Sequence, residues 1–466
     1  MHATFRNLSP LTTAAIILFT LLPLYYASYQ YRIRHPYNIS PFENFDHHTP
    51  HLHRPSEAEW IRSWLSTSLI HPFNPSPLAT FCNQTTTPWR PNLVLNLENA
   101  NGGIGNIRGN FLDFLFQAIE VGASIMLPGM ATRSRENLAN VWASRATLGE
   151  FFDEEWFLRV LREACPDMRI FHGEEEEGMD VLEGIWVPRS RRVDEDVEGG
   201  NSRKGLVEGL DEFLRLRGKG EGEGGRNVVV NVERRLWDVD TRGGVGVRGL
   251  RRNFGQILRV KPGIRRLSAV VVQRLEARYG VNVEIDPSDA IPKNAFFGAH
   301  LRTEADAKAV GWVDGPMTFE NQTDAYIREA VKSGLGIMYV ASGNSTDLER
   351  FRQKAAMHKP PVTVTSKMDL LPANEVAILE GMSWDQQALV DYEVLLRCSR
   401  FGGIVKSSFA YNIAMTRNQW LEDQGRVIDP WRVQHSEVGV AFDDGLSRII
   451  GRDEFHEHRI PRGMWP

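Results

Sequence analysis

The stretch NLVLNLENANGGIGNIRGNFLDFLFQAIEVGASIML, residues 92–127, decides the fold. It opens with a short apolar run, 92–97, that predicts a β-strand, and it continues through a glycine-rich turn at 102–105. Apolar residues then recur at helical spacing over 110–121, and 124–127 predicts the next strand. A strand, a tight loop, a helix and a second strand form a βαβ unit, which requires the two strands to pair in parallel.

Strands and helices alternate again in the second half of the chain. Strands are predicted at 295–301, 337–341, 362–365 and 403–406, and helices at 264–279, 324–333, 347–356, 385–398 and 409–416. This alternation indicates a second doubly wound α/β domain. We therefore predict an α/β protein with a first domain over 89–260 and a second over 261–466. Residues 173–226, rich in Glu, Gly and Lys, are predicted to be a largely flexible insertion with one short helix at 206–216.

The glycine-rich turn is the first candidate site. Glycines after a strand let the backbone approach a ligand, and the start of the following helix favours negative charge. Gly103, Gly105 and Gly109 do not have the G-x-G-x-x-G spacing of dinucleotide enzymes. A tight turn without a ligand explains the glycines equally well. Asn106 and Arg108 add polar side chains that such a turn does not need.

Two later strand ends carry the other candidate sites. The apolar run before His300 leads into Arg302, Glu304 and Asp306, and ligands bind at the carboxyl ends of strands in such sheets. An arginine there can stabilise the charge that develops on a departing diphosphate. A purely structural pair between arginine and carboxylate is the alternative. The third stretch, 402–409, places two hydroxyls at a helix start, where they either seat a phosphate or simply cap the helix.

Taken together, these stretches resemble one family of glycosyltransferases, the GDP-fucose protein O-fucosyltransferases and their relatives. The shared pattern is G-G-x-G-N-x-R, then H-x-R-x-E-x-D, then D-Y followed later by S-S-F; its positions here are 102–108, 300–306, 391–392 and 407–409. The resemblance covers roughly 92–170 and 250–420. It implies a GT-B fold, in which two Rossmann-like domains face a cleft and the second holds the donor. It also implies transfer of fucose or a related sugar from a GDP-sugar to a protein or glycan hydroxyl, with inversion and without a metal or other cofactor.

The resemblance also implies roles for single residues. Arg302 would contact the donor diphosphate and assist its departure, and Asp391 would read the guanine base. The remaining expected donor-binding residues are His300, Ser407, Ser408 and Phe409, and the expected cleft residues of the first domain are Gly103, Gly105, Asn106 and Arg108.

The chain departs from the pattern at one position. Some relatives carry a carboxylate in the glycine loop as general base, and Gly103 stands at the comparable place here. Glu98 and Glu304 are the two substitutes within reach, and the sequence does not choose between them. Arg302 and Glu304 are therefore the predicted catalytic residues.

The segment before the folded region predicts a membrane anchor. Leu11–Ala27 is almost entirely apolar and uncharged, which is long enough for a short transmembrane helix. We predict a short cytosolic terminus over 1–10, a signal-anchor over 11–28 and a stem over 29–88. A cleaved signal peptide is the alternative. Three glycosylation tripeptides begin after this span, at Asn83, Asn321 and Asn344, which favours a lumenal body in the Golgi or endoplasmic reticulum.

Composition limits the other classes of function. The net charge of −5 gives no basic surface for nucleic acid, and the three cysteines form no C-x-x-C pair. They allow one intrachain disulfide and a free thiol, or three buried thiols. Three rival functions remain: a metal-dependent glycosyltransferase using Asp238-Val239-Asp240, a NAD-dependent reductase, and an inactive sugar-binding protein.

Overall fold

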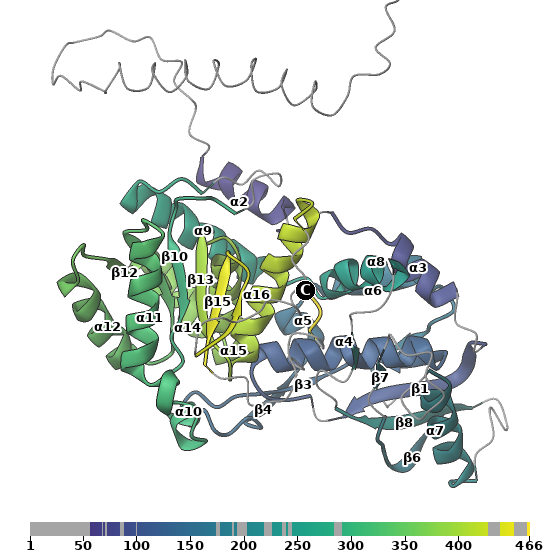
Figure 1. Ribbon diagram of the computed structural model, residues 1–466. Coiled ribbons are helices and arrows are strands. Elements are labelled where there is room, and N and C mark those ends of the chain that lie inside the picture. Colours follow the sequence, from purple (N-terminus) through teal and green to yellow (C-terminus); the bar gives the residue numbers. More distant parts are fainter. Residues whose placement is uncertain are drawn as a thin grey trace, which may run out of the picture. The chain divides into compact units, whose positions relative to one another are not determined.

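Two largely parallel β-sheets organise the computed structural model (Figure 1). The residues that the structure describes are 56–67, 69, 72–83, 88–98, 100–173, 178–188, 191–192, 203–218, 226–234, 239–240, 245–283, 291–426, 439–451 and 464–466. Both sheets lie within one compact unit, Pro55–Pro466. The predicted α/β class with parallel strands is confirmed.

The first sheet has five parallel strands in the order β5-β2-β1-β8-β6. Its strands are β1 (Arg90–Glu98), β2 (Ala123–Met126), β5 (Ile170–Phe171), β6 (Met179–Trp186) and β8 (Asn227–Glu233). Successive side chains of a strand point to opposite faces of its sheet. Accordingly, Leu93, Leu95 and Leu97 of β1 enter the main core, whereas Val94 joins a small separate cluster with Val229.

The helix α4 (Ile104–Glu120) connects β1 to β2 and is buried almost throughout. β1 and β2 pair in parallel, so the βαβ unit predicted from 92–127 is confirmed. The helix begins six residues earlier than the predicted 110–121, directly after the N-cap Gly103. The glycine-rich turn therefore runs straight into the first turn of the helix.

The second sheet has six strands in the order β12-β11-β10-β13-β15-β14, and all but the last pair are parallel. Its strands are β10 (Phe297–His300), β11 (Ile337–Ala341), β12 (Thr363–Thr365), β13 (Arg400–Ile404), β14 (Val440–Asp443) and β15 (Ser447–Ile450). β14 and β15 were not predicted. They complete the sheet beside β13.

Helices cover both faces of the second sheet. A Cβ at Gly298 would touch Leu395 and Cys398, which lie at the end of α15 (Trp384–Leu396) and just after it. A Cβ at Gly402, in the neighbouring strand, would instead touch Tyr326 of α11 (Phe319–Lys332). Glycine thus lets both helices pack closely against the strands, which is the doubly wound arrangement predicted for this half.

Shorter elements complete the described structure. The helices are α2 (Glu57–Ser66), α3 (Ser76–Asn83), α5 (Leu148–Phe151), α6 (Glu154–Ala164), α7 (Arg203–Arg215), α8 (Val245–Phe254), α9 (Pro262–Tyr279), α10 (Ala305–Ala309), α12 (Ser345–Met357), α13 (Lys367–Leu370), α14 (Ala373–Gly381) and α16 (Ser408–Asp423). Two 3₁₀ turns are η1 (Gly255–Ile257) and η3 (Gly315–Met317), and two small ribbons pair β3 (Met130–Thr132) with β4 (Ser144–Ala146) and β7 (Arg191–Arg192) with β9 (Val239–Asp240).

Two predicted boundaries need correction. The stem was expected over 29–88, but α2 and α3 belong to the folded unit because they bury apolar side chains in the main core. Trp64 is only 1% exposed, and the indole of Trp60 donates a 3.0 Å hydrogen bond to the backbone of α9. The region 173–226 was expected to be largely flexible, yet it supplies β6, the edge strand of the first sheet. The short helix predicted within it at 206–216 is confirmed by α7. The boundary near 260 stays a prediction; it falls between the strands of the two sheets.

The predicted signal-anchor at 11–28 lies outside the described residues. Within the described part of the chain, no helix is both long and apolar enough to cross a membrane.

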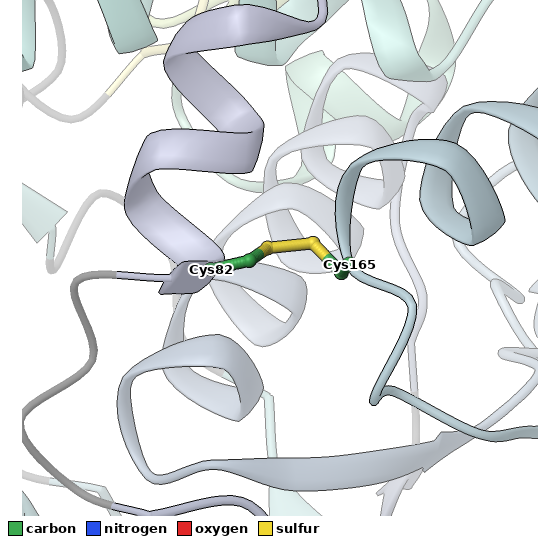
Figure 2. Close-up of a disulfide and its surroundings, with 2 residues drawn as sticks. All are labelled: Cys82 and Cys165. Carbon is green, nitrogen blue, oxygen red and sulfur yellow. A yellow bond between two sulfur atoms is a disulfide. The ribbon is translucent and has the colours of Figure 1, made fainter.

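Cys82 and Cys165 form a disulfide between the end of α3 and the end of α6 (Figure 2), while Cys398 is a buried free thiol. Of the two cysteine arrangements left open by the sequence, one disulfide with one free thiol is the observed one.

Candidate active site

A cavity of about 600 Å³ lies where the strand ends of the two sheets meet. It is lined by the glycine loop after β1, by the residues that follow β10, β11 and β13, and by one side of α15. Every predicted site residue except Arg108 lines it: Gly103, Gly105, Asn106, His300, Arg302, Glu304, Asp391, Ser407, Ser408 and Phe409. The three motifs therefore converge on one site, although Gly103 and Phe409 are 306 positions apart in the sequence.

The glycine loop forms the side of the cavity contributed by the first sheet. Gly102 has φ +102°, a backbone conformation that other residues rarely adopt. A Cβ at Gly105 would lie 2.8 Å from the Phe409 backbone nitrogen and 2.9 Å from the Ser408 carbonyl carbon. The first motif is thus packed directly against the third. The carboxamide of Asn106 has no hydrogen-bond partner among the described residues and lines the cavity, so it is available to a ligand.

Arg108 lies elsewhere, which contradicts its predicted place in the cleft. Its guanidinium is buried and donates to the backbone oxygens of Trp465 at 2.6 Å, and of Gly255 and Pro466 at 2.9 Å each. It also donates to Asn412 of α16 at 3.3 Å. These contacts make Arg108 a structural residue that joins α4 to η1, α16 and residues 464–466. It lines a separate pocket of about 90 Å³.

Arg302, two residues after β10, is held by two carboxylates. Its guanidinium donates to Glu304 at 2.6 Å and makes two hydrogen bonds to Asp306, at 2.9 Å and 2.6 Å. Burial alone would lower the pKa of Arg302, but the two carboxylates outweigh burial and raise that pKa above its ordinary value. The cavity therefore contains a permanently charged guanidinium in a fixed orientation.

Glu304 is fully engaged in this arrangement. One oxygen accepts from Arg302, and the other accepts a 2.8 Å hydrogen bond from the Gly343 backbone N–H. Burial would raise the pKa of Glu304, yet Arg302 and its other neighbours hold it below the ordinary value. In this geometry Glu304 orients Arg302. Its predicted part in catalysis as a base stays a prediction. The other candidate, Glu98, ends β1, and its side chain is outside the described set.

Sequence reasoning missed a second arginine at the site. Arg133 follows β3 and donates to Asp306 at 2.5 Å, so Asp306 lies between two guanidinium groups. The backbone N–H of Arg133 donates to Asp385, in the first turn of α15, at 3.3 Å. No motif in the sequence marks Arg133 or Asp385, because they are 252 positions apart and meet only in the folded chain.

His300 and the third motif form the next part of the wall. The Nδ1 of His300 lies 3.2 Å from the Ser407 hydroxyl, and its ring lies 4.8 Å from that of Phe409 between centroids. Burial lowers the pKa of His300 to about 4, so the imidazole is neutral at pH 7. Ser407 also caps α16 by accepting from the Ala410 N–H. The capping role foreseen as an alternative is therefore present, and the same hydroxyl lines the cavity.

Asp391 lies six residues after Asp385 on α15 and also lines the cavity. It accepts hydrogen bonds from the Tyr339 hydroxyl at 2.7 Å and from the Lys367 ammonium at 2.5 Å. These partners fix its carboxylate at the cavity wall.

Among the described residues, no group of three or more His, Cys, Asp or Glu side chains is arranged to hold a metal ion. Asp238 of the D-x-D triplet is outside the described range.

Fold and cavity define a class of protein. Parallel α/β sheets bind nucleotide-type ligands beyond the carboxyl ends of their strands, and this cavity presents fixed arginines, hydroxyls and a helix start there. The family model for GDP-fucose protein O-fucosyltransferase matches residues 93–419, which is 327 of the 466 residues. The chain belongs to this family and is a glycosyltransferase.

Solved structures with a similar chain course include two fucosyltransferases. POFUT1 in complex with GDP-fucose is 12% identical, with 71% of this chain and 96% of that chain covered and a TM-score of 0.42. The fucosyltransferase NodZ from Bradyrhizobium is 13% identical, with 71% and 95% covered and a TM-score of 0.35. Similarity at this level adds nothing to the assignment, which rests on the family model. No curated protein matches the chain.

Proposed function

We propose that this protein transfers fucose from GDP-fucose to a hydroxyl of a protein or glycan acceptor, with inversion at the anomeric carbon, in a GT-B arrangement of its two sheets. The observation that carries the proposal is Arg302, whose partly buried guanidinium is fixed by Glu304 and Asp306 at the wall of a 600 Å³ cavity. A fixed positive charge stabilises the charge that develops on a departing diphosphate more effectively than a mobile one.

Other residues of the cavity wall could bind the phosphates, the sugar and the guanine base of GDP-fucose. Ser407 and Ser408 lie at the start of α16, where hydroxyls and free backbone N–H groups favour phosphate. Neutral His300 and the ring of Phe409 offer a surface for the sugar or nucleotide. Asp391, held by Tyr339 and Lys367, is the proposed partner of the guanine N–H groups. Asn106 contributes an unpaired carboxamide from the opposite side.

We also propose that catalysis proceeds without a metal ion. The diphosphate charge would be balanced by side chains: Arg302 and Arg133 are both fixed at the cavity, and Lys406 lines it. In a metal-dependent transferase a bound divalent cation supplies that charge instead. Loss of turnover on adding EDTA would contradict this part of the proposal.

The proposed location is the secretory pathway, with residues 11–28 as a single membrane anchor and the body in the lumen of the Golgi or endoplasmic reticulum. The disulfide between Cys82 and Cys165 supports this, because such bonds form and persist in oxidising compartments. Asn83 and Asn321 are exposed and begin glycosylation tripeptides, and the Asn321 carboxamide donates a 2.6 Å hydrogen bond to the Gly315 carbonyl. The side chain of Asn344 instead caps α12 and bonds the Thr303 carbonyl, so glycosylation is not expected there.

Thermal melting of the full-length protein with GDP, UDP, ADP or NAD tests the donor class. A ligand stabilises the folded state that binds it. GDP at about a hundred times its dissociation constant should add ~2.7 kcal/mol to the free energy of unfolding, whereas NAD should add nothing. Stabilisation by NAD but not by GDP would overturn the proposed function.

A further inference from the structure

The general base is the catalytic part that no motif supplies. Transfer to a hydroxyl releases a proton from the acceptor, and a carboxylate at the reacting centre is a common way to accept it. Among the described residues, the carboxylates that line the cavity are Glu304, Asp369, Asp385 and Asp391. These four carboxylates differ in whether they form an ion pair with a basic side chain.

Three of the four carboxylates are neutralised by a cation. Glu304 pairs with Arg302 at 2.6 Å, and Asp391 pairs with Lys367 at 2.5 Å. Asp369 pairs with Arg352 at 2.7 Å. Each of these three carboxylates is therefore already engaged in an ion pair.

Asp385 is different. It is only 2% exposed, yet among the described residues it has no ion pair. Its single hydrogen bond is the 3.3 Å contact between Oδ2 and the Arg133 N–H, and no described group donates to Oδ1. The Asp385 side chain thus brings a free oxygen to the cavity wall.

The position of Asp385 along α15 separates it from the proposed guanine site. Asp391, the proposed guanine partner, follows it by six residues along α15, and both residues line the cavity. At about 1.5 Å per residue, the two are separated by roughly 9 Å along the helix axis. Asp385 is also joined through Arg133 and Asp306 to Arg302, the proposed leaving-group residue.

We propose that Asp385 is the general base of the transfer reaction, an inference that rests on the proposed function. The acceptor oxygen forms a bond to the anomeric carbon of fucose as its O–H proton passes to Oδ1 of Asp385. The bond between that carbon and the diphosphate oxygen breaks, and its electron pair leaves with GDP beside Arg302. One bond to the anomeric carbon forms as another breaks, the proton is held by Asp385, and no further reactant is needed.

The protonation behaviour of Asp385 agrees with this role. Burial raises the pKa of Asp385 to about 6, and Arg133 opposes that shift only in part. Other charged side chains at the same cavity wall are Arg302 and Glu304, and the opposing charge is that of Arg133. A base must be deprotonated, so activity should fall as the pH decreases through about 6.

The test measures GDP release from GDP-fucose by the full-length protein, with water as the acceptor. Asp385→Asn keeps the size and an oxygen for the Arg133 N–H but removes the base. Release should fall about 100-fold or more, in the range typical of general bases, and the fall in activity below pH 6 should disappear. Binding of GDP, followed by melting, should be unchanged.

Two further variants separate the explanations. Asp385→Ala with added azide should recover GDP release, because azide attacks carbon without losing a proton. Asp444→Asn is the matched control, since Asp444 is another buried carboxylate with a raised pKa but lies outside the cavity. It should keep the wild-type rate and pH profile.

The outcomes are distinct. Wild-type rate and pH profile in Asp385→Asn, with an active wild type, would overturn the base and leave the proposed function standing. Loss in Asp385→Ala that azide does not restore would also overturn it. A wild type that neither binds GDP nor releases it from GDP-fucose would overturn the proposed function, and the base with it.

Discussion

At the scale of single residues, the site depends on which carboxylates are paired. Arg302 and Arg133 together engage Glu304 and Asp306, and this leaves Asp385 as an unpaired carboxylate at the cavity. The sequence indicated Arg302, Glu304 and their neighbours because they follow one strand. It gave no sign of Arg133 or Asp385, whose importance depends on contacts between distant parts of the chain.

Glu304→Gln distinguishes a positioning residue from a base. The variant keeps the shape and the hydrogen bond from Gly343 but removes one charge beside Arg302. Because Asp306 still holds the guanidinium, we expect kcat/KM for GDP-fucose to fall about tenfold, or ~1.4 kcal/mol of transition-state stabilisation. Arg302 and other neighbours hold the pKa of Glu304 below its ordinary value, so this residue is ionised near neutral pH and the loss should not depend on pH there. If kcat/KM fell more than 100-fold and the variant no longer lost activity below about pH 6, Glu304 would be the base instead.

At the scale of secondary structure, β1, the glycine loop, α4 and β2 were predicted almost as observed. Their signal is local: apolar alternation, a glycine turn and helical spacing. β6 was missed because only two of its eight side chains are buried, so its sequence looks like a solvated loop. Arg108 was misplaced for a different reason. It lies one helical turn from the cavity residues, and its partners Trp465 and Pro466 are more than 350 positions away.

The contact between α4 and α16 gives a prediction at this scale. In Gly105→Ala the added Cβ would meet the Ser408 and Phe409 backbone at 2.9 Å and 2.8 Å. Backbone cannot move aside as a flexible side chain can, so we expect a loss of ~1–3 kcal/mol in the free energy of unfolding. Binding of GDP should weaken as well, because the same contact shapes the cavity.

Gly263→Ala is the control for that variant. Gly263 lies at the start of α9, and a Cβ there would meet nothing within 4 Å. Alanine should raise stability by ~0.5–1 kcal/mol and leave GDP binding unchanged. Equal effects of the two substitutions on GDP binding, followed by calorimetry, would contradict the role assigned to the Gly105 contact.

At the scale of the whole folded unit, long-range links join elements that are far apart in sequence. The disulfide connects α3 to α6 across 83 positions. Trp465 packs against Phe254 and Phe116 and donates a 2.9 Å hydrogen bond to Asp113 of α4. Such links explain why α2 and α3, expected in a stem, belong to the folded unit: their apolar faces become visible as core only when the partner helices are in place.

The central claim is that Arg302 drives departure of GDP from a GDP-sugar, and one measurement tests it most directly. Release of GDP from GDP-fucose should be followed for wild type, Arg302→Ala and Arg302→Lys, with melting curves confirming that each variant is folded. Removing one preorganised group that stabilises developing charge typically costs about 100- to 1000-fold in rate, and the alanine variant should lose at least that much. Lysine keeps the charge without the paired geometry and should be intermediate. Wild-type turnover in folded Arg302→Ala would contradict the account.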